Sequence, residues 1–323
     1  MKRLCLLIFI LGFEYIAYSH DDHLLIMFWN IENFFDYTDG GEGESDREWS
    51  SFGARRWTKK RFHTKCDAVA KSIFHIADKY GKMPDVIGLA EVENKTAIFK
   101  LLNSTLLRKY DYKVVHYDSR DRRGIDVALL YRESVLTRAS VSLKIPSYNG
   151  SCLATRDILH VCLEDGTGQK YNMLVNHHPS KYGGADLSDG RRNAVMSAMK
   201  EMCDSLQSDD SSIPIIAMGD FNDTPDGVQF DILDGVLYNK SDSLHSSGLG
   251  TIRYQGRWEL IDMFLVSASL YVRSQMHIIE IPFLMSYEKK YPGMKPYRTY
   301  SGPRYIGGVS DHCPIVLCIF RTN

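Results

Sequence analysis

Short apolar runs, rich in β-branched and aromatic residues, recur from residue 24 to residue 320 and constrain the fold more than any other feature. Each run is six to eight residues long, which is the length of a buried strand rather than of a helix. In chain order the runs are "LLIMFW", "DVIGLA", "YKVVHY", "DVALLY", "ILHVCL", "NMLVNHH", "IPIIAMGD", "LIDMFLV" and "PIVLCIF".

Helical patterns separate some of these runs. Thr58 is placed to cap a helix over residues 59–79, and further helices are expected over residues 95–109 and 188–206. No repeat, low-complexity tract or Gly/Ser linker interrupts the pattern, so we expect a single domain over residues 20–323. Mixed strands and helices over one large unit predict an α/β or α+β domain with central sheets and outer helices.

The charge balance limits the class of partner. The 323 residues carry a formal net charge of −1, whereas a protein with a large nonspecific phosphate footprint is usually basic. The net charge does not exclude a local basic surface that contacts nucleic acid. Outside the first 19 residues there are six scattered cysteines, for which disulfides are possible although the spacing is not that of a disulfide framework. Neither a CxxC nor an HExxH zinc spacing is present.

The N-terminus has the order of a secretory signal peptide. Lys2 and Arg3 precede the apolar run 4–13, and small or polar residues follow up to Ser19. The apolar run is too short to span a bilayer comfortably. We therefore expect a cleaved signal over residues 1–19, no stable membrane anchor, and a secreted or periplasmic protein; an uncleaved N-terminal anchor is the alternative.

Polar residues stand where several of the expected strands end. Taken singly they have structural explanations: Asn30 as a turn cap, Glu91 as a carboxylate at a helix start, His177 as a loop histidine. A carboxylate inside the apolar run 260–266 is harder to explain, because if buried it needs a partner. The polar residues of this kind up to residue 266 are Asn30, Glu91, His177, Asp220, Asn222 and Asp262.

The stretch "GGVSDHCPIV" near the C-terminus completes this series with Asp311 and His312. Both residue types are common in loops, and Pro314 can open a strand, which is the structural explanation. The chemical explanation is a hydrolytic site, in which His312 takes a proton from water and Asp311 helps to hold a metal.

In this order, the eight residues from Asn30 to His312 resemble the endonuclease/exonuclease/phosphatase superfamily, with "GDFN" and "SDH" as its most specific motifs. This superfamily includes deoxyribonuclease I, abasic-site nucleases, inositol-polyphosphate phosphatases and neutral sphingomyelinases. The resemblance implies a four-layered α/β/β/α sandwich with the active site at one edge, where loops from both sheets meet.

The resemblance also implies a role for each residue. Glu91 matches the principal Mg²⁺ ligand, with Asn30 and Asp311 close by. His312 matches the general base, and Asp262 matches the carboxylate that orients it.

The remaining positions concern the substrate. His177 matches a histidine that stabilises phosphoryl oxygens or protonates the leaving group; His178 is the alternative for this position. Asp220 and Asn222 match the pair that positions the nucleophile and the scissile phosphate. Arg156 resembles a substrate-contacting arginine, and a surface arginine at a strand start is an equal alternative.

These roles agree with the chemistry of phosphate esters. Attack on an anionic phosphodiester needs a cation, a positioned base and donors to the developing charge. Mg²⁺ prefers oxygen ligands and keeps several waters, so Glu91 and Asp311 suffice; Mn²⁺ is possible. An imidazole acts as a base near neutral pH when it is neutral and oriented, and Asp262 is placed to orient it.

The sequence therefore predicts a secreted, Mg²⁺-dependent phosphoester hydrolase, with a nuclease acting on nucleic acid as the favoured activity. A phosphatase or a sphingomyelinase-like phosphodiesterase would share every core residue and act on another phosphate ester. A catalytically silent binding module is disfavoured because Glu91, Asp220 and His312 are all present. No protein partner is implied.

Two segments mix basic and aromatic residues. "ARRWTKKRF", residues 54–62, either meets phosphates or bases or is a loop followed by a solvated helical turn. The tyrosine-rich segment, residues 287–308, leads into the "SDH" motif, and we expect it to line the cleft, although its tyrosines suit loop packing as well.

Overall fold

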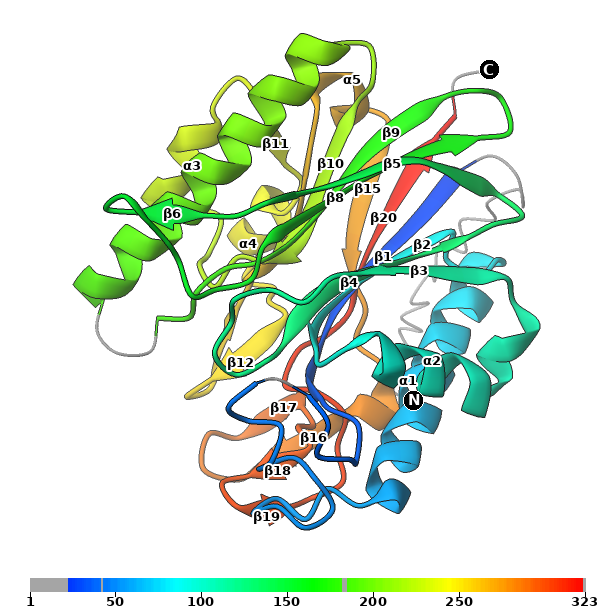
Figure 1. The fold of residues 1–323 in the computed structure, drawn as a ribbon, viewed down its shortest axis with the longest axis vertical. Helices are drawn as coiled ribbons and strands as arrows, with labels where there is room; N and C mark the ends of the chain where they lie inside the picture. The colour runs from blue at the N-terminus through cyan, green and yellow to red at the C-terminus, as the bar shows by residue number, and fades with distance from the viewer. Residues whose placement is uncertain (1–22, 42, 182–184, 322–323) are drawn as a thin grey trace, which may run out of the picture.

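Two six-stranded sheets form the centre of the computed structural model, which describes residues 23–41, 43–181 and 185–321 (Figure 1). The first sheet has the order β15 (Ser274–Ile278), β20 (Ile315–Phe320), β1 (His23–Phe34), β2 (Val86–Val92), β4 (Asp126–Arg132), β3 (Tyr112–His116). The second has the order β11 (Tyr238–Asn239), β14 (Asp262–Val266), β10 (Ile215–Asp220), β9 (Lys170–His177), β8 (Ile158–Asp165), β5 (Leu136–Lys144).

The sheets pack face to face, with helices on their outer faces. In β1, Ile26 and Phe28 belong to the core between the sheets, whereas the alternate residues Met27 and Trp29 pack toward the helices. This period of two follows from the alternation of side chains along a strand. The predicted four-layered α/β/β/α sandwich is confirmed.

The helices largely follow the prediction. Helix α1 (Lys59–Tyr80) begins after Thr58, whose Oγ1 accepts a hydrogen bond from the backbone N–H of Arg61 at 3.4 Å. Helix α3 (Ala185–Asp209) is longer than expected. The prediction of one helix over residues 95–109 was wrong, because α2 (Lys95–Ser104) ends at Thr105. Thr105 is extended, and its side chain caps the separate 3₁₀ helix η1 (Leu106–Lys109).

The remaining elements are short. Two are further α-helices, α4 (Asp242–Ser246) and α5 (Ala268–Tyr271), and two are 3₁₀ helices, η2 (Val228–Leu233) and η3 (Pro282–Leu284). Four two-stranded ribbons pair β6 (Ser147–Tyr148) with β7 (Ser151–Cys152), β12 (Ile252–Tyr254) with β13 (Arg257–Glu259), β16 (Met285–Glu288) with β17 (Gly293–Pro296), and β18 (Tyr300–Ser301) with β19 (Arg304–Tyr305).

Three statements about the sequence features can be made from the described residues. The predicted signal peptide, residues 1–19, lies outside them. Among the helices that the structure describes, none is long and apolar enough to cross a membrane. The cysteines at positions 66, 152, 162, 203, 313 and 318 are all unpaired.

Candidate active site

The predicted polar residues gather at one edge of the two sheets, because strand register brings them there. In the second sheet, Asp220 at the end of β10 pairs with His177 of β9 on one side and with Asp262 of β14 on the other. In the first sheet, Asn30 of β1 pairs with Ala90 of β2, one residue before Glu91. At this edge β10 and β9 pack so closely that only glycine fits at position 219, because a Cβ there would lie 2.5 Å from the backbone oxygen of Asn176.

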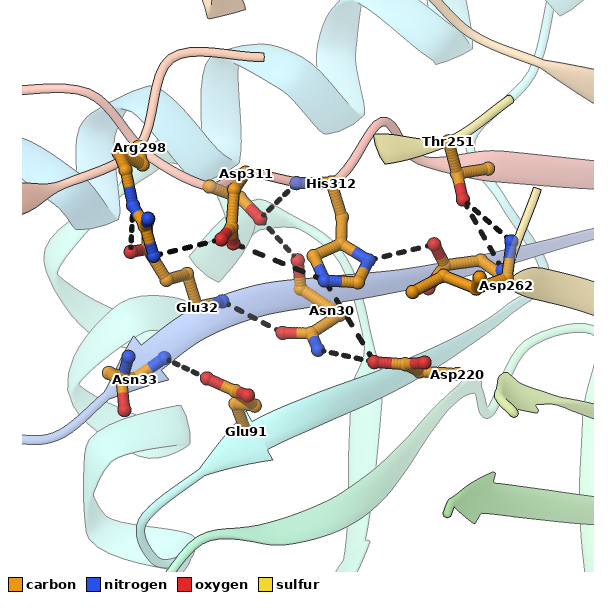
Figure 2. Close-up of polar contacts among 12 residues, drawn as sticks. Asn30, Glu32, Asn33, Glu91, Asp220, Thr251, Asp262, Arg298, Asp311 and His312 are labelled. Atoms are coloured by element: carbon orange, nitrogen blue, oxygen red, sulfur yellow. Dashed lines mark hydrogen bonds and ion pairs between the residues drawn. The ribbon is translucent and has the colours of Figure 1, made fainter. Parts of the chain in front are cut away.

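Asp262 and His312 form a buried hydrogen-bonded pair (Figure 2). Nδ1 of His312 lies 2.8 Å from Oδ2 of Asp262, which is 1% exposed. Burial lowers the pKa of His312, but the carboxylates of Asp262, Asp220 and Asp311 outweigh it and raise the pKa well above its usual value. The pair fixes the ring, and the other ring nitrogen, Nε2, lies 3.9 Å from Oδ2 of Asp220.

The backbone around the "SDH" motif is held to β1. The Ser310 hydroxyl donates to the backbone oxygen of Asn30 at 2.6 Å and accepts from the N–H of His312 at 3.0 Å. The indole of Trp29 donates to the backbone oxygen of His312 at 2.9 Å. These bonds fix the position of His312 relative to the first sheet, while Asp262 fixes it relative to the second.

Asp220 is the centre of a second set of hydrogen bonds. The Asn30 amide donates to its Oδ2 at 3.0 Å, and the backbone N–H of Asn222 donates to its Oδ1 at 2.9 Å. Burial and the nearby Asp262 raise the pKa of Asp220 to about 7, against the lowering effect of His312 and Asn30. Asn222 has a left-handed φ of 52° and donates its amide to the backbone oxygen of His178 at 2.9 Å.

Glu91 sits at an irregularity of β2 in a strained conformation. The pairing of β2 with β4 skips it, and its φ of 62° lies in the left-handed region that disfavours residues with a Cβ. Its Oε2 accepts from the backbone N–H of Asn33 at 2.7 Å (Figure 2). Its Oε1 lies 4.0 Å from both Nε2 of His177 and Nη1 of Arg123. Strained backbone of this kind clusters at functional sites, which agrees with the role predicted for Glu91.

The Asp311 carboxylate forms an ion pair with Arg298. Nη2 of Arg298 lies 3.0 Å from Oδ2 of Asp311, and Nε of Arg298 lies 3.3 Å from Oε1 of Glu32 (Figure 2). Burial and Asp311 raise the pKa of Glu32 to about 7, while Lys65 and Arg298 act in the opposite direction. Arg298 and Glu32 were not predicted as site residues. Neither has a sequence signal beyond the position of Arg298 in the tyrosine-rich segment.

The two adjacent histidines differ in their surroundings. Nε2 of His177 lies 3.6 Å from Oδ2 of Asp220, so this ring faces the polar cluster. The His178 ring instead packs against Phe221, with 4.9 Å between centroids. The structure places His177, the residue chosen from the sequence, beside the other site residues.

Arg156 is buried behind these histidines. Its Nε donates to the backbone oxygen of His177 at 3.1 Å, and its Nη2 donates to that of His178 at 2.7 Å. Its Nη1 lies 2.9 Å from Oδ2 of Asp121. The alternative of a surface arginine was wrong, since Arg156 is 5% exposed. Contact with a substrate stays a prediction, because all three groups bind protein atoms.

Two sets of oxygen and nitrogen atoms can be compared as metal ligands. Asp220, Asp262 and His312 lie close enough together to hold an ion, but Nδ1 of His312 already binds Asp262. Within the described residues, Oε1 of Glu91 has no hydrogen bond, and the side chains of Glu91 and Asp311 are 13% and 38% exposed. Oxygen donors with open access fit a hard divalent cation such as Mg²⁺. Glu91 and Asp311 suit such an ion, whereas Asn30 is 1% exposed and its Oδ1 accepts a hydrogen bond from the backbone N–H of Glu32; the predicted ligand set of Asn30, Glu91 and Asp311 stays a prediction.

The two basic and aromatic segments pack against each other. Trp57 is fully buried, and Arg61 lies over the ring of Tyr305 with 4.3 Å to the centroid. Arg55 donates to the backbone oxygen of Gly302 at 2.6 Å. The basic and aromatic side chains named here thus stabilise the loops below the sheets in Figure 1. Arg298, from the tyrosine-rich segment, reaches the candidate site, where it pairs with Asp311.

The chain matches a known protein family over nearly its whole length. A profile described as "Endonuclease/Exonuclease/phosphatase family" matches residues 25–321. Among curated protein sequences no significant match was found.

Solved structures show the same fold at low sequence identity. An endonuclease/exonuclease/phosphatase family protein from Bacteroides thetaiotaomicron is 14% identical, with a TM-score of 0.60 over 93% of this chain and 95% of that chain. A mannosyl-6-phosphatase from the same species is 14% identical, with a TM-score of 0.59 over 92% and 100%. The human Nocturnin catalytic domain is 16% identical, with a TM-score of 0.58 over 93% and 94%. The chain belongs to the endonuclease/exonuclease/phosphatase family of phosphoester hydrolases.

Proposed function

We propose that this protein is an exported, divalent-metal-dependent hydrolase that cleaves phosphodiester bonds of nucleic acid by attack of a water molecule. The observation that carries the proposal is the buried Asp262 and His312 pair, whose free Nε2 faces the cluster around Asp220. A ring nitrogen held this way is the arrangement that proton transfer from water requires.

The residues divide the reaction between them. His312 takes the proton of the attacking water at Nε2, and Asp262 accepts the hydrogen bond of Nδ1–H and stabilises the imidazolium that forms. Asp220 and Asn222 position the water and the scissile phosphate. His177 donates a hydrogen bond to the phosphoryl oxygens or a proton to the leaving oxygen.

Metal binding is assigned to Glu91, Asp311 and Asn30. A divalent cation held by these oxygens, Mg²⁺ or Mn²⁺, would polarise the phosphoryl group and offset part of the negative charge that raises the His312 pKa. Arg298 now pairs with Asp311 and is half exposed, so it is free to turn toward a phosphate when the carboxylate binds a cation.

A phosphatase acting on a phosphorylated sugar is the second candidate. The structural similarity to a mannosyl-6-phosphatase favours it, and the site residues suit a monoester as well as a diester. Export rests on the charged, apolar and small-residue order of residues 1–19. N-terminal sequencing of the protein recovered outside the cytoplasm tests that part, and an intact Met1 contradicts cleavage.

The activity is tested with Mg²⁺ on plasmid DNA, RNA, sphingomyelin, a phosphorylated inositol and mannose 6-phosphate, with Glu91→Ala as the control. Cleavage of DNA or RNA by the wild type alone supports the nuclease. Turnover of another ester with no cleavage of nucleic acid keeps the proposed hydrolase but makes that ester the substrate in place of nucleic acid. No turnover of any of the five contradicts the proposed hydrolase and favours a binding module.

A further inference from the structure

A pocket of about 530 Å³ opens beside the candidate active site. Four arginines line it, from the loop between β3 and β4, the segment before β8, and helix α3. We call it the arginine pocket; its lining includes Arg122, Arg123, Arg156, Arg191, Asp121 and Tyr148.

The arginine pocket is continuous with the residues that hold the site. Arg123 lines the pocket, and its Nη1 lies 4.0 Å from Oε1 of Glu91. Arg156 also lines it and donates to the backbone oxygen of His177. A group bound in this pocket is therefore a neighbour of a phosphate placed between Glu91 and His177.

The charges of the pocket do not cancel. Its only lining carboxylate among the described residues, Asp121, is shared between Arg156 at 2.9 Å and Arg123 at 3.6 Å. Arg122 pairs with Glu44 at 3.0 Å, on the surface. Within the described part of the chain, Arg191 is exposed and makes no ion pair. Among the described residues the pocket thus keeps one unpaired positive charge, that of Arg191, in a protein whose formal net charge is −1.

The shape and chemistry favour an anion larger than a single phosphate. Guanidinium groups bind phosphate through paired hydrogen bonds, which gives arginine its advantage over lysine at such sites. A volume of about 530 Å³ exceeds what one phosphate fills and suits a group of nucleotide size. Tyr148, which is 42% exposed, offers an aromatic face at the rim of the pocket.

We propose that the arginine pocket binds a second phosphate of the substrate, carried on a substituent of about nucleotide size next to the scissile phosphate. The inference rests on the proposed function and narrows its substrate to compounds with at least two phosphates. An oligonucleotide and a sugar bisphosphate both meet this condition, so the experiment includes both chemistries.

The test is equilibrium binding, because it does not depend on turnover. Isothermal titration in EDTA compares thymidine 3′,5′-bisphosphate with thymidine 5′-monophosphate, and glucose 1,6-bisphosphate with glucose 1-phosphate. The proteins are the wild type, Arg191→Gln, and Arg138→Gln as a matched control, since Arg138 is exposed on β5 outside the pocket.

In at least one pair, the wild type should bind the bisphosphate about tenfold more tightly than the monophosphate, as expected for one additional charged hydrogen-bonding group. Arg191→Gln should lose most of this advantage, and Arg138→Gln should retain it. The pair that shows the advantage identifies the nucleotide or the sugar as the source of the second phosphate.

Equal affinity for both members of both pairs in the wild type overturns the inference, and so does an unchanged advantage in Arg191→Gln. Failure of the proposed function has a different signature, because it is a lack of hydrolysis in the substrate panel and leaves these binding constants unaffected.

Discussion

Replacing Asp262 by asparagine is the most informative single change at the site. The Asp262 carboxylate accepts the hydrogen bond of His312 Nδ1–H at 2.8 Å in a position that is 1% exposed. An asparagine keeps the size of the side chain but presents an amide, whose NH₂ group favours the tautomer that carries its proton on Nε2. In that tautomer Nε2 cannot accept a proton from water.

The size of the effect follows from the loss of this hydrogen bond. A hydrogen bond to a charged group contributes about 1.5–3 kcal/mol, which corresponds to roughly tenfold to 150-fold in rate. Loss of the whole general-base contribution costs about 10²–10⁴-fold. We therefore expect kcat of Asp262→Asn to fall by about 10²-fold or more, with KM changed by less than about threefold because Asp262 is 1% exposed and so is not accessible to a substrate.

The assay is steady-state hydrolysis of bis(p-nitrophenyl) phosphate with saturating Mg²⁺, together with thermal unfolding to show that the variant is folded. Asp231→Asn is the matched control, since Asp231 is an exposed carboxylate in η2. A kcat within threefold of the wild type, in a folded Asp262→Asn protein, would refute the role given to the pair.

Three further predictions concern the metal, a buried ion pair and a buried histidine. Glu91→Gln should weaken Mn²⁺ binding at least tenfold in calorimetry; unchanged affinity contradicts the assignment of Glu91 as a ligand. Arg156→Met should lower the free energy of unfolding by about 3–5 kcal/mol in urea titrations, because Asp121 keeps only Arg123 at 3.6 Å and the buried backbone oxygens of His177 and His178 lose their donor; a loss below about 1 kcal/mol argues against that reading. Burial lowers the pKa of His178 to about 3, so between about pH 6.5 and 3 the unfolded chain binds a proton that the folded protein does not. The contribution of neutral His178 to the free energy of unfolding is present in full above pH 6.5 and falls by about 2 kcal/mol between pH 7 and pH 5. Over the same range, the free energy of unfolding of His178→Phe should fall by about 2 kcal/mol less than that of the wild type. An equal fall in both proteins refutes the assignment.

Strand pattern was enough to predict an α/β domain with central sheets and polar residues at the strand ends, whereas the four layers and the edge that holds the site were implied by the family resemblance. Asp220 and Asp262 were both expected at strand ends or within apolar runs, and the register of β10 with β14 then pairs them directly. Local patterns carry this information because a strand that is buried on both faces needs a continuous apolar run.

The rest depends on contacts between distant parts of the chain. Arg298 binds Glu32, 266 residues away in the sequence, through a loop whose path has no periodic pattern. The left-handed backbone of Glu91 was equally hidden, since glycine is the residue that usually marks such a conformation. The exposed edge strand β5 was missed because most of its residues face solvent and show no apolar run.

The most direct test of the central claim is the rate of bis(p-nitrophenyl) phosphate hydrolysis by the wild type, His312→Ala and His245→Ala in the presence of Mg²⁺ and then of EDTA. His245 is a partly exposed histidine of α4 and serves as the matched control. We predict hydrolysis by the wild type and His245→Ala with Mg²⁺ only, and a loss of about 10²-fold or more in His312→Ala. Full activity in His312→Ala, or hydrolysis that persists in EDTA, would contradict the account.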